Sequence, residues 1–179
     1  MDARSRSGDE LVDVVDEHDA VVATVPRRRV RAERLRHRAV FVVVNSSDGK
    51  LLVHRRSDGK DLWPGRWDVC VGGVVGAGEA WAAAARRELA EEVGIDARPE
   101  PLRAGRYTDD DVDLVARCYR VVSDGPIAFA DGEVAEARWV DRAELAALVA
   151  TETFVPDSSA LLGPADLFPL PPPANTHEE

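Results

Sequence analysis

Hydrophobic residues along the chain form short runs separated by polar turns, a pattern typical of a β-rich mixed domain. The runs LVDVV (11–15) and AVVATV (20–25) flank a polar Asp-Glu-His-Asp segment and predict a hairpin. The β-branched run AVFVVV (39–44) is nearly continuous, which indicates a strand buried on both faces. An Asn-Ser-Ser-Asp-Gly turn then leads into a partner strand at 51–56.

The second half of the chain alternates between strand and helix patterns. Further predicted elements are a short helix after Pro26, strands at 67–71, 112–122 and 136–141, and helices at 80–93 and 142–150. The 67–71 strand is expected to end in Gly72-Gly73, and Gly94 stands where a helix C′ glycine is expected. The order β-β-(short α)-β-β-β-α-β-β-α predicts a mixed α/β domain with a helix docked on a curved sheet.

Both ends of the chain are polar or proline-rich. Residues 1–10 show no periodicity, and residues 163–179 contain a PLPPPANTHEE run that cannot sustain a helix or a sheet ladder. We therefore expect mobile tails at 1–10 and 163–179 around one domain at 11–162. A total of 179 residues is within the usual range for a single domain.

Charge and cysteine content narrow the class of protein. The 23 basic and 33 acidic residues give a net charge of −10, which argues against a dedicated nucleic-acid binder. Cys70 and Cys118 lie far apart and suit free thiols in a reducing cytosol. No run approaches the roughly 18 apolar residues of a membrane span, so we predict a cytoplasmic protein with no membrane partner.

Candidate chemistry concentrates in residues 73–95, GVVGAGEAWAAAARRELAEEVGI. Residues three or four apart on a helix are neighbours, so Glu88, Glu91 and Glu92 place several carboxylates together. Such crowding is unfavourable unless a cation binds among the carboxylates, and hard oxygen ligands favour Mg²⁺ or Mn²⁺. Arg87, one turn before Glu91, could hold that carboxylate in a bidentate pair. The alternative is an ordinary solvated acidic helix face.

The spacing of this segment resembles the signature box of the Nudix hydrolase superfamily at every fixed position. The matching residues are Gly73, then five residues, Glu79, then seven residues, Arg87-Glu88-Leu89, one residue, Glu91-Glu92, one residue, and Gly94-Ile95. The resemblance implies the Nudix fold, a curved mixed sheet sandwiched between helices, here with an N-terminal β-hairpin extension. It also implies hydrolysis of a nucleoside diphosphate linked to another moiety.

The same resemblance implies roles for individual residues. Glu88, Glu91 and Glu92 would bind the divalent metal together with the backbone oxygen of Gly73, Arg87 would orient a glutamate, and Glu79 would support the loop. The general base differs between subfamilies, and the candidates are Glu91 and an acidic residue from another loop. A metal would neutralise the pyrophosphate oxygens, and a carboxylate would then complete activation of water.

Segments around the box resemble the isopentenyl-diphosphate isomerase-like branch, among them LLVHRRSDGKDLWPGRWD and DGEVAEARWV. In the isomerase a catalytic Cys follows the Pro-Gly-x-Trp motif by five residues, and that place is Gly72 here. His37 matches one isomerase metal histidine, but the expected partner seven residues earlier is Val30. A hydrolase on an isomerase-like frame therefore fits better than an isomerase.

Several residues outside the box are candidates for binding a small-molecule pyrophosphate substrate. Arg55 and Arg56 end a predicted strand and could grip a phosphate, and Trp67 could stack on a base, although core packing is commoner for Trp. The basic stretch comprises Arg27, Arg28, Arg29, Arg31, Arg34, Arg36 and Arg38. It could attract an anion, but pairing with the acidic surface is the favoured interpretation.

Three questions stay open at the level of sequence. A non-catalytic nucleotide-sensing module is the competing class of function, although sensors commonly lose box glutamates and this box is complete. The identity of the substrate depends on loops whose geometry the sequence does not give. The N-terminal hairpin could mediate a homodimer.

Overall fold

Strand β3 (His37–Asn45) lies at the centre of the fold, and its side chains are buried on both faces. Alternate residues of a strand point to opposite faces of the sheet. Val40, Val42 and Val44 accordingly belong to one hydrophobic cluster, and Ala39, Phe41 and Val43 belong to another. The continuous β-branched run thus packs against two separate layers, as the sequence predicts.

The computed structural model describes residues 8–129 and 132–169. The other strands are β1 (Leu11–Val15), β2 (Val21–Pro26), β4 (Leu51–Arg56), β5 (Trp67–Asp68), β6 (Val71–Val74), β7 (Glu100–Thr108), β8 (Asp113–Val122) and β9 (Val134–Val140). Strand β3 is antiparallel to β1, β4 and β6 and parallel to β8. Strand β7 pairs with β8, while β5 and β9 pair with β4. The sheet is therefore mixed, as expected.

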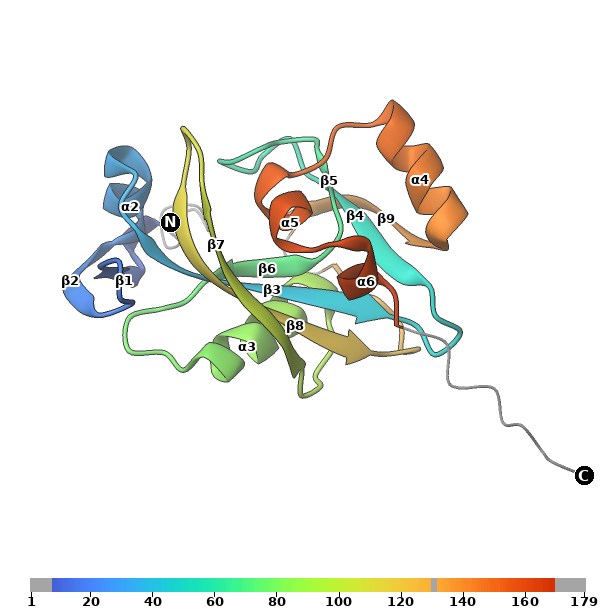
Figure 1. The fold of residues 1–179 in the computed structure, drawn as a ribbon, viewed down its shortest axis with the longest axis horizontal. Helices are drawn as coiled ribbons and strands as arrows, with labels where there is room; N and C mark the ends of the chain where they lie inside the picture. The colour runs from blue at the N-terminus through green and yellow to red at the C-terminus, as the bar shows by residue number, and fades with distance from the viewer. Residues whose placement is uncertain (1–7, 130–131, 170–179) are drawn as a thin grey trace, which may run out of the picture.

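Helices cover both faces of this sheet (Figure 1). Helix α3 (Trp81–Val93) packs Ala84, Ala85, Leu89 and Val93 into the cluster that contains Val40. Helices α4 (Arg142–Thr151), α5 (Pro156–Leu161) and α6 (Pro164–Leu167) contribute leucines to the opposite cluster. Asp141 begins α4 through a capping box with Glu144. The predicted sandwich of helices around a mixed sheet is confirmed.

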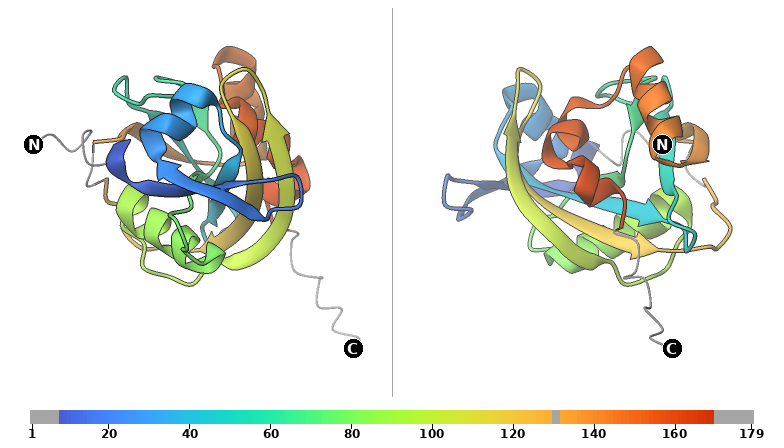
Figure 2. Two further views of the ribbon diagram at one scale, coloured as in Figure 1. Left: turned by 90° about the vertical axis from the view of Figure 1, so that its left-hand side faces the viewer. Right: turned by 45° about the vertical axis from the view of Figure 1, so that its right-hand side comes forward.

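The hairpin of β1 and β2 and the short helix α2 (Arg27–Glu33) form one end of the molecule (Figure 2). Pro26 is the N-cap of α2, as its fixed φ favours. Val12, Val14, Val25, Val30 and Val74 make a small third cluster that fastens this end to β6. The predicted hairpin and the helix after Pro26 are both confirmed.

Two features of the sheet differ from the sequence prediction. Strand β7 was not predicted, because its side chains are mostly exposed and lack the apolar alternation of a half-buried strand. The single strand expected at 67–71 is split into β5 and β6, and the Gly72-Gly73 pair lies inside β6. At Gly72 the chain runs so close to β3 that a Cβ would lie 2.0 Å from the carbonyl oxygen of Val40.

The expected tail boundaries are also wrong where the structure describes them. Leu167 and Phe168 are buried in the core, and Asn45 Nδ2 donates a hydrogen bond to the Leu167 carbonyl at 2.9 Å. Apolar side chains ahead of the prolines thus extend the packed domain beyond residue 162. Near the other end, Glu10 forms an ion pair with Arg27. Residues 1–7 and 170–179, which make up most of both predicted tails, lie outside the described residues.

None of the helices among the described residues is long and apolar enough to span a bilayer.

Replacing Gly72 by alanine is expected to destabilise the protein by about 3 kcal/mol or more, because the new Cβ would overlap backbone atoms of β3 and no side chain can move aside. Gly125→Ala is the matched control, since its Cβ would meet only the Ser123 hydroxyl at 3.4 Å. Urea unfolding of the two variants measures the difference. Equal stability of the two variants would contradict the close approach of β6 to β3.

Candidate active site

Helix α3 presents the glutamates of the box because its other face is fixed in the core. Ala80 begins the helix, and Gly94 ends it in the left-handed conformation with φ 72°. Leu89 and Val93 are fully buried against the sheet. Glu88, Glu91 and Glu92 lie on another side of the helix and line a cleft. The predicted loop-helix-loop is therefore the element that positions the carboxylates.

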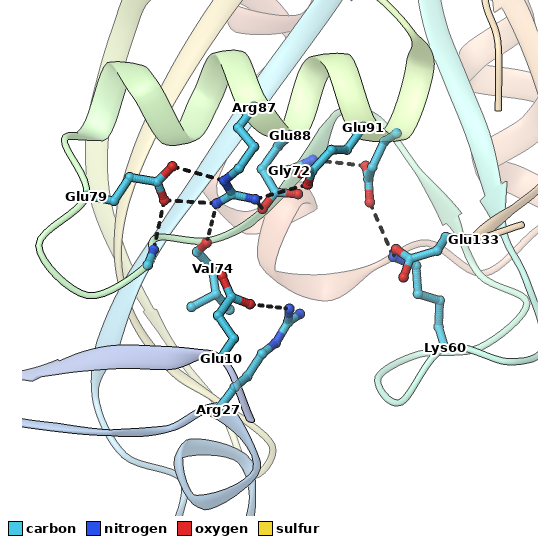
Figure 3. A network of polar contacts seen from close by, with 12 residues as sticks. Glu10, Arg27, Lys60, Gly72, Val74, Glu79, Arg87, Glu88, Glu91 and Glu133 are labelled. Carbon is cyan, nitrogen blue, oxygen red and sulfur yellow. Dashed lines mark hydrogen bonds and ion pairs between the residues drawn. The ribbon is translucent and has the colours of Figure 1, made fainter. Parts of the chain in front are cut away.

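Arg87 connects the glutamates in a network of hydrogen bonds (Figure 3). Its Nε and Nη2 donate to the two carboxylate oxygens of Glu79, both at 2.9 Å. Its Nη1 donates to Glu88 at 2.6 Å and to Glu91 at 3.1 Å. The expected bidentate partner was Glu91, and this expectation is wrong, since Glu79 takes that place. The contact of Arg87 with Glu91 is a single hydrogen bond.

Glu79 supports the loop that precedes α3. Its Oε2 accepts a hydrogen bond from the Gly76 N–H at 2.9 Å, and its side chain is mostly buried. The Arg87 guanidinium and the Gly76 amide together lower the pKa of the Glu79 carboxyl despite partial burial. Both oxygens of Glu79 are occupied by these donors, so Glu79 fits a supporting role and not a ligand role.

Glu88 and Glu92 are buried carboxylates held close together, with exposures of 8% and 4%. Burial, followed by the charge of Glu92, raises the pKa of Glu88 to about 7, while Arg87 opposes this shift. The Glu88 carboxylate lies directly against Gly73, where a Cβ would come within 2.5 Å of it. A side chain larger than that of glycine at position 73 would displace the Glu88 carboxylate from this place.

Two residues from other loops complete the site. Lys60 Nζ lies 3.2 Å from Glu92 Oε1 and also pairs with Glu133. The second oxygen of Glu92 accepts a hydrogen bond from the Gly72 N–H at 3.2 Å. These residues line an acidic cleft of about 420 Å³, together with Glu10, Arg27, Gly73, Arg87, Glu88 and Glu91. Both acidic and basic side chains therefore line the cleft.

The carboxylates that line the acidic cleft are of the type that binds a hard divalent cation, but they are not arranged around one common point. Among the described residues no group of three His, Cys, Asp or Glu side chains already surrounds one point. Arg87 and Lys60 instead contact the oxygens of Glu88, Glu91 and Glu92. Burial and the neighbouring Glu92 raise the pKa of Glu88, and a cation bound among these carboxylates would relieve that unfavourable charge.

The three residues predicted to bind substrate, Arg55, Arg56 and Trp67, lie in different parts of the structure. Arg56 lines a small cavity next to the acidic cleft, and its Nε donates to the Leu62 carbonyl at 3.2 Å. Arg55 lines neither space and instead lies 3.8 Å from Glu136. Trp67 is only 2% exposed and packs in the core below Arg138, so the expectation that it stacks on a substrate base is wrong.

The basic stretch mostly pairs with acidic side chains, as favoured from the sequence. Arg28, Arg29, Arg36 and Arg38 pair with Asp9, Glu33, Asp113 and Asp19 respectively. Arg27 pairs with Glu10, and both Arg27 and Arg31 line the cavity that contains Arg56. His37 and His54 are both buried.

Several residues of the site escape prediction from the sequence. Lys60, Glu133 and Asp157 lie in loops or at a helix start, far from the box along the chain. Pairing of β4 with β9 brings Glu133 to the acidic cleft, and no local pattern signals this long-range contact. The one available signal for Lys60 is its place in the turn that follows Arg56.

Cys70 lies outside both cavities. Its thiol is buried beside Asp68, with Sγ 3.6 Å from Oδ1. Burial, together with the charge of Asp68, raises the pKa of the Cys70 thiol well above its usual value. A thiol that is buried and held protonated is a poor nucleophile. Because β6 leaves no space for a side chain at Gly72, neither position provides an isomerase-type cysteine.

The fold and the acidic helix define a class of protein, a mixed α/β domain that presents glutamates on a loop-helix-loop. The family model described as NUDIX domain matches residues 35–160. An uncharacterized Nudix hydrolase of Yersinia pestis is 41% identical over 150 residues, covering 83% of this chain and 81% of that protein. The chain belongs to the Nudix hydrolase family.

Other relatives extend this similarity. The uncharacterized Nudix hydrolase YfcD of Escherichia coli K12 is 39% identical over 159 residues, covering 88% of this chain and 87% of that protein. The crystal structure of DR0079 from Deinococcus radiodurans matches with a TM-score of 0.73 and 31% identity, over 85% of this chain and 96% of that one. The Nudix domain of Shewanella oneidensis NrtR, solved with ADP ribose, shares the fold at 22% identity and a TM-score of 0.56, over 69% of this chain and 82% of that one.

Proposed function

We propose that this Nudix hydrolase uses a divalent metal, Mg²⁺ or Mn²⁺, to cleave a pyrophosphate linkage in a nucleoside diphosphate derivative or a related organic pyrophosphate. The observation that carries the proposal is the pair of buried carboxylates, Glu88 and Glu92, facing a cleft that also contains Arg27 and Lys60. Buried like charges are costly, so they indicate a bound cation, and the nearby basic side chains suit the phosphates that share it.

Glu88, Glu91, Glu92 and the backbone oxygen of Gly73 would hold the metal. When bound, the cation neutralises phosphate oxygens and lowers the pKa of a water. Arg87 keeps Glu88 and Glu91 in position through its two contacts, and Glu79 in turn fixes Arg87. Lys60 lines the cleft beside Glu92 and Glu133, where its ammonium group would contact a substrate phosphate.

Two carboxylates are candidates for the general base. The Glu91 side chain is 58% exposed and lines the cleft, where water reaches the carboxylate oxygen that Arg87 does not contact. Glu133 supplies the acidic residue from another loop and reaches the cleft beside Lys60. A carboxylate must lie within hydrogen-bond reach of the attacking water to accept its proton. Comparing the pH profiles of Glu91→Gln and Glu133→Gln distinguishes the two candidates.

Incubation of the purified protein with organic pyrophosphates tests the proposal. The panel comprises nucleoside di- and triphosphates, nucleotide sugars, dinucleoside polyphosphates and prenyl diphosphates, each with Mg²⁺, with Mn²⁺ and with EDTA. We expect hydrolysis of at least one nucleoside phosphate with metal and none with EDTA. A nucleotide that raises the melting temperature but survives intact with Mg²⁺ would indicate a sensor, and conversion of a prenyl diphosphate to its isomer would indicate an isomerase.

A homodimer through the N-terminal hairpin is a second part of the proposal. Leu11, Val21 and Val22 expose apolar side chains on β1 and β2, at 53%, 50% and 61%. Such exposed apolar side chains on an edge strand favour pairing with another copy. Sedimentation analysis of Val22→Lys against the unmodified chain tests this contact.

A further inference from the structure

Lys60 is a cation from outside the box helix that lies against one of the box carboxylates. It belongs to the loop between β4 and β5, and its side chain points toward the glutamates of α3 (Figure 3). Its Nζ lies 3.2 Å from Glu92 Oε1 and also contacts the Glu133 carboxylate. The Lys60 side chain is only 15% exposed, so its ammonium group is largely removed from water. Burial of an ammonium group is costly unless carboxylates compensate its charge, and here two carboxylates do so.

Glu92 in turn depends on Lys60 for its charge balance. The Glu92 side chain is 5% exposed, and among the described residues Lys60 is the basic side chain that pairs with it. The second oxygen of Glu92 accepts a hydrogen bond from the Gly72 N–H, a group without net charge. A buried carboxylate that loses its cation is strongly destabilising. Lys60 therefore provides the positive charge that Glu92 needs when no metal is bound.

The two cations that contact the box carboxylates are held very differently. Arg87 donates two hydrogen bonds to Glu79, both at 2.9 Å, and one to the Val74 carbonyl at 3.1 Å. Its planar guanidinium is thus fixed by groups on the loop before α3. In the described part of the chain, the Lys60 ammonium contacts two carboxylates and no other group, and it lies at the end of a flexible four-carbon stem. Of the two cations, Lys60 is therefore the one that can exchange.

The backbone around Lys60 is held in place, so its side chain can move alone. The Arg56 N–H donates to the Arg66 carbonyl at 2.9 Å, and Arg56 Nε donates to the Leu62 carbonyl at 3.2 Å. The Lys60 N–H donates to the Ser57 carbonyl at 3.2 Å. These bonds close the loop at its base and within it. Rotation about the bonds of the Lys60 stem is then sufficient to withdraw the ammonium group from the box.

We propose that Lys60 is an internal cation that holds Glu92 in place in the metal-free protein and competes with the divalent metal for this carboxylate, so that Lys60 sets the metal affinity of the site. Two cations about 3 to 4 Å apart repel each other strongly in a poorly hydrated cleft, so Glu92 cannot pair fully with both. Lys60 is therefore a positioning residue, which acts through Glu92. The inference deepens the proposed function and rests on it.

The alternative is that Lys60 only supports the local structure, and the two roles predict opposite changes in metal affinity. A supporting Lys60 raises the affinity, because it keeps the Glu92 carboxylate preorganised, and its loss would weaken metal binding. A competing Lys60 lowers the affinity, because its ion pair must break before Glu92 binds the metal. Loss of a competing Lys60 would strengthen metal binding. The sign of the change therefore distinguishes the two roles.

Binding of Mn²⁺ to the full chain measures this sign without turnover, through the electron paramagnetic resonance signal of the free ion. We expect Lys60→Met to bind Mn²⁺ about 10-fold more tightly than the unmodified chain, because no ion pair to a buried carboxylate has to break. Lys60→Arg, which keeps the charge, should bind within about 3-fold of the unmodified chain. Lys50→Met is the control, since it removes an equal charge directly before β4, whereas Lys60 follows that strand. Equal tightening in Lys50→Met would indicate a general charge effect and overturn the inference.

Acetylation of lysine amines tests the same exchange in the unmodified chain. The sequence contains two lysines, Lys50 and Lys60, so Lys50 is the internal reference. Reaction with an N-hydroxysuccinimide ester, measured by mass spectrometry, should label Lys60 slowly in the metal-free protein. Saturating Mn²⁺ should raise the rate at Lys60 at least about 3-fold relative to Lys50, because Glu133, whose side chain is 45% exposed, protects the amine little by itself.

These measurements separate failure of the inference from failure of the proposed function. If Lys60→Met binds Mn²⁺ more tightly and Mn²⁺ exposes Lys60, but no organic pyrophosphate is hydrolysed, the proposed function is wrong and the inference stands. If pyrophosphates are hydrolysed but Lys60→Met binds Mn²⁺ equally or more weakly, the inference alone is wrong. Absence of Mn²⁺ binding by both chains would overturn both. If Lys60→Met fails to fold, acetylation decides, and a rate at Lys60 that does not change with Mn²⁺ overturns the inference.

Discussion

Replacing Glu92 by glutamine is expected to lower turnover by about 100- to 1,000-fold while the protein remains folded. Glu92 is 4% exposed, and its two oxygens accept hydrogen bonds from Lys60 and from the Gly72 N–H. Glutamine keeps the shape and one acceptor oxygen but removes a charge from the proposed metal cluster. The cation that organises the transition state would then be held more weakly, and the loss should fall mainly on kcat.

Stability should change much less than activity, because two effects oppose each other. Neutralising residue 92 removes repulsion with Glu88, and it also removes the ion pair with Lys60, which keeps its contact with Glu133. We expect the melting temperature to shift by no more than about 4 °C, equivalent to about 1 kcal/mol in a chain of this size. Glu100→Gln, on the exposed strand β7, is the control for loss of one carboxylate.

Cys70→Ala provides the contrasting outcome in the same assay. The Cys70 thiol is buried and its pKa is raised, which makes it a poor nucleophile. Hydrolysis by Cys70→Ala should therefore continue at a rate close to that of the unmodified chain. Near-normal rates in Glu92→Gln together with loss of activity in Cys70→Ala would show that the metal-carboxylate mechanism is wrong and that thiol chemistry operates.

Sequence predicts this site best where the chemistry lies on one helix. Glu88, Glu91, Glu92 and Arg87 lie on α3, whose periodicity and terminal glycine are local properties of the chain. The central strand β3 is equally clear, because burial on both faces demands an unbroken apolar run. In both cases residues close in sequence fix the geometry, so spacing is enough to predict it.

Prediction fails where long-range pairing decides the position of a side chain. Glu133 reaches the acidic cleft through the pairing of β4 with β9, and Asp157 lines the small cavity beside that cleft from the start of α5. Strand β7 pairs with β8 and leaves most of its side chains in solvent, so its sequence carries little apolar pattern. Trp67 follows a turn rich in Pro and Gly, and only the packed structure shows that its ring is directed into the core.

In the metal-free protein the Glu88 carboxyl is expected to make a contribution that lowers stability as the pH rises from about 4.5 to about 7, and Glu88→Gln is expected to remove this contribution. Burial and Glu92 raise the pKa of Glu88 to about 7 in the folded state, against an ordinary value of 4.5. Within this window the folded state keeps a proton that the unfolded state has released, so higher pH favours unfolding. The full shift corresponds to a destabilisation on the order of 3 kcal/mol above pH 7.

Thermal unfolding with EDTA present, from pH 4.5 to pH 8, measures this difference between the two chains. Asp157, whose pKa burial also raises to about 7, contributes a fall in the same direction, and His37 and His54, with lowered pKa values, favour folding as the pH rises. All three residues are present in both chains, so their effects cancel in the comparison. We expect Glu88→Gln to melt several degrees higher at pH 7.5, with the gap closing toward pH 4.5. Mg²⁺ should then stabilise the unmodified chain more than the variant, because the cation relieves the buried charge only where Glu88 is present. A gap that does not change with pH would show that the Glu88 carboxyl is not held protonated by its surroundings.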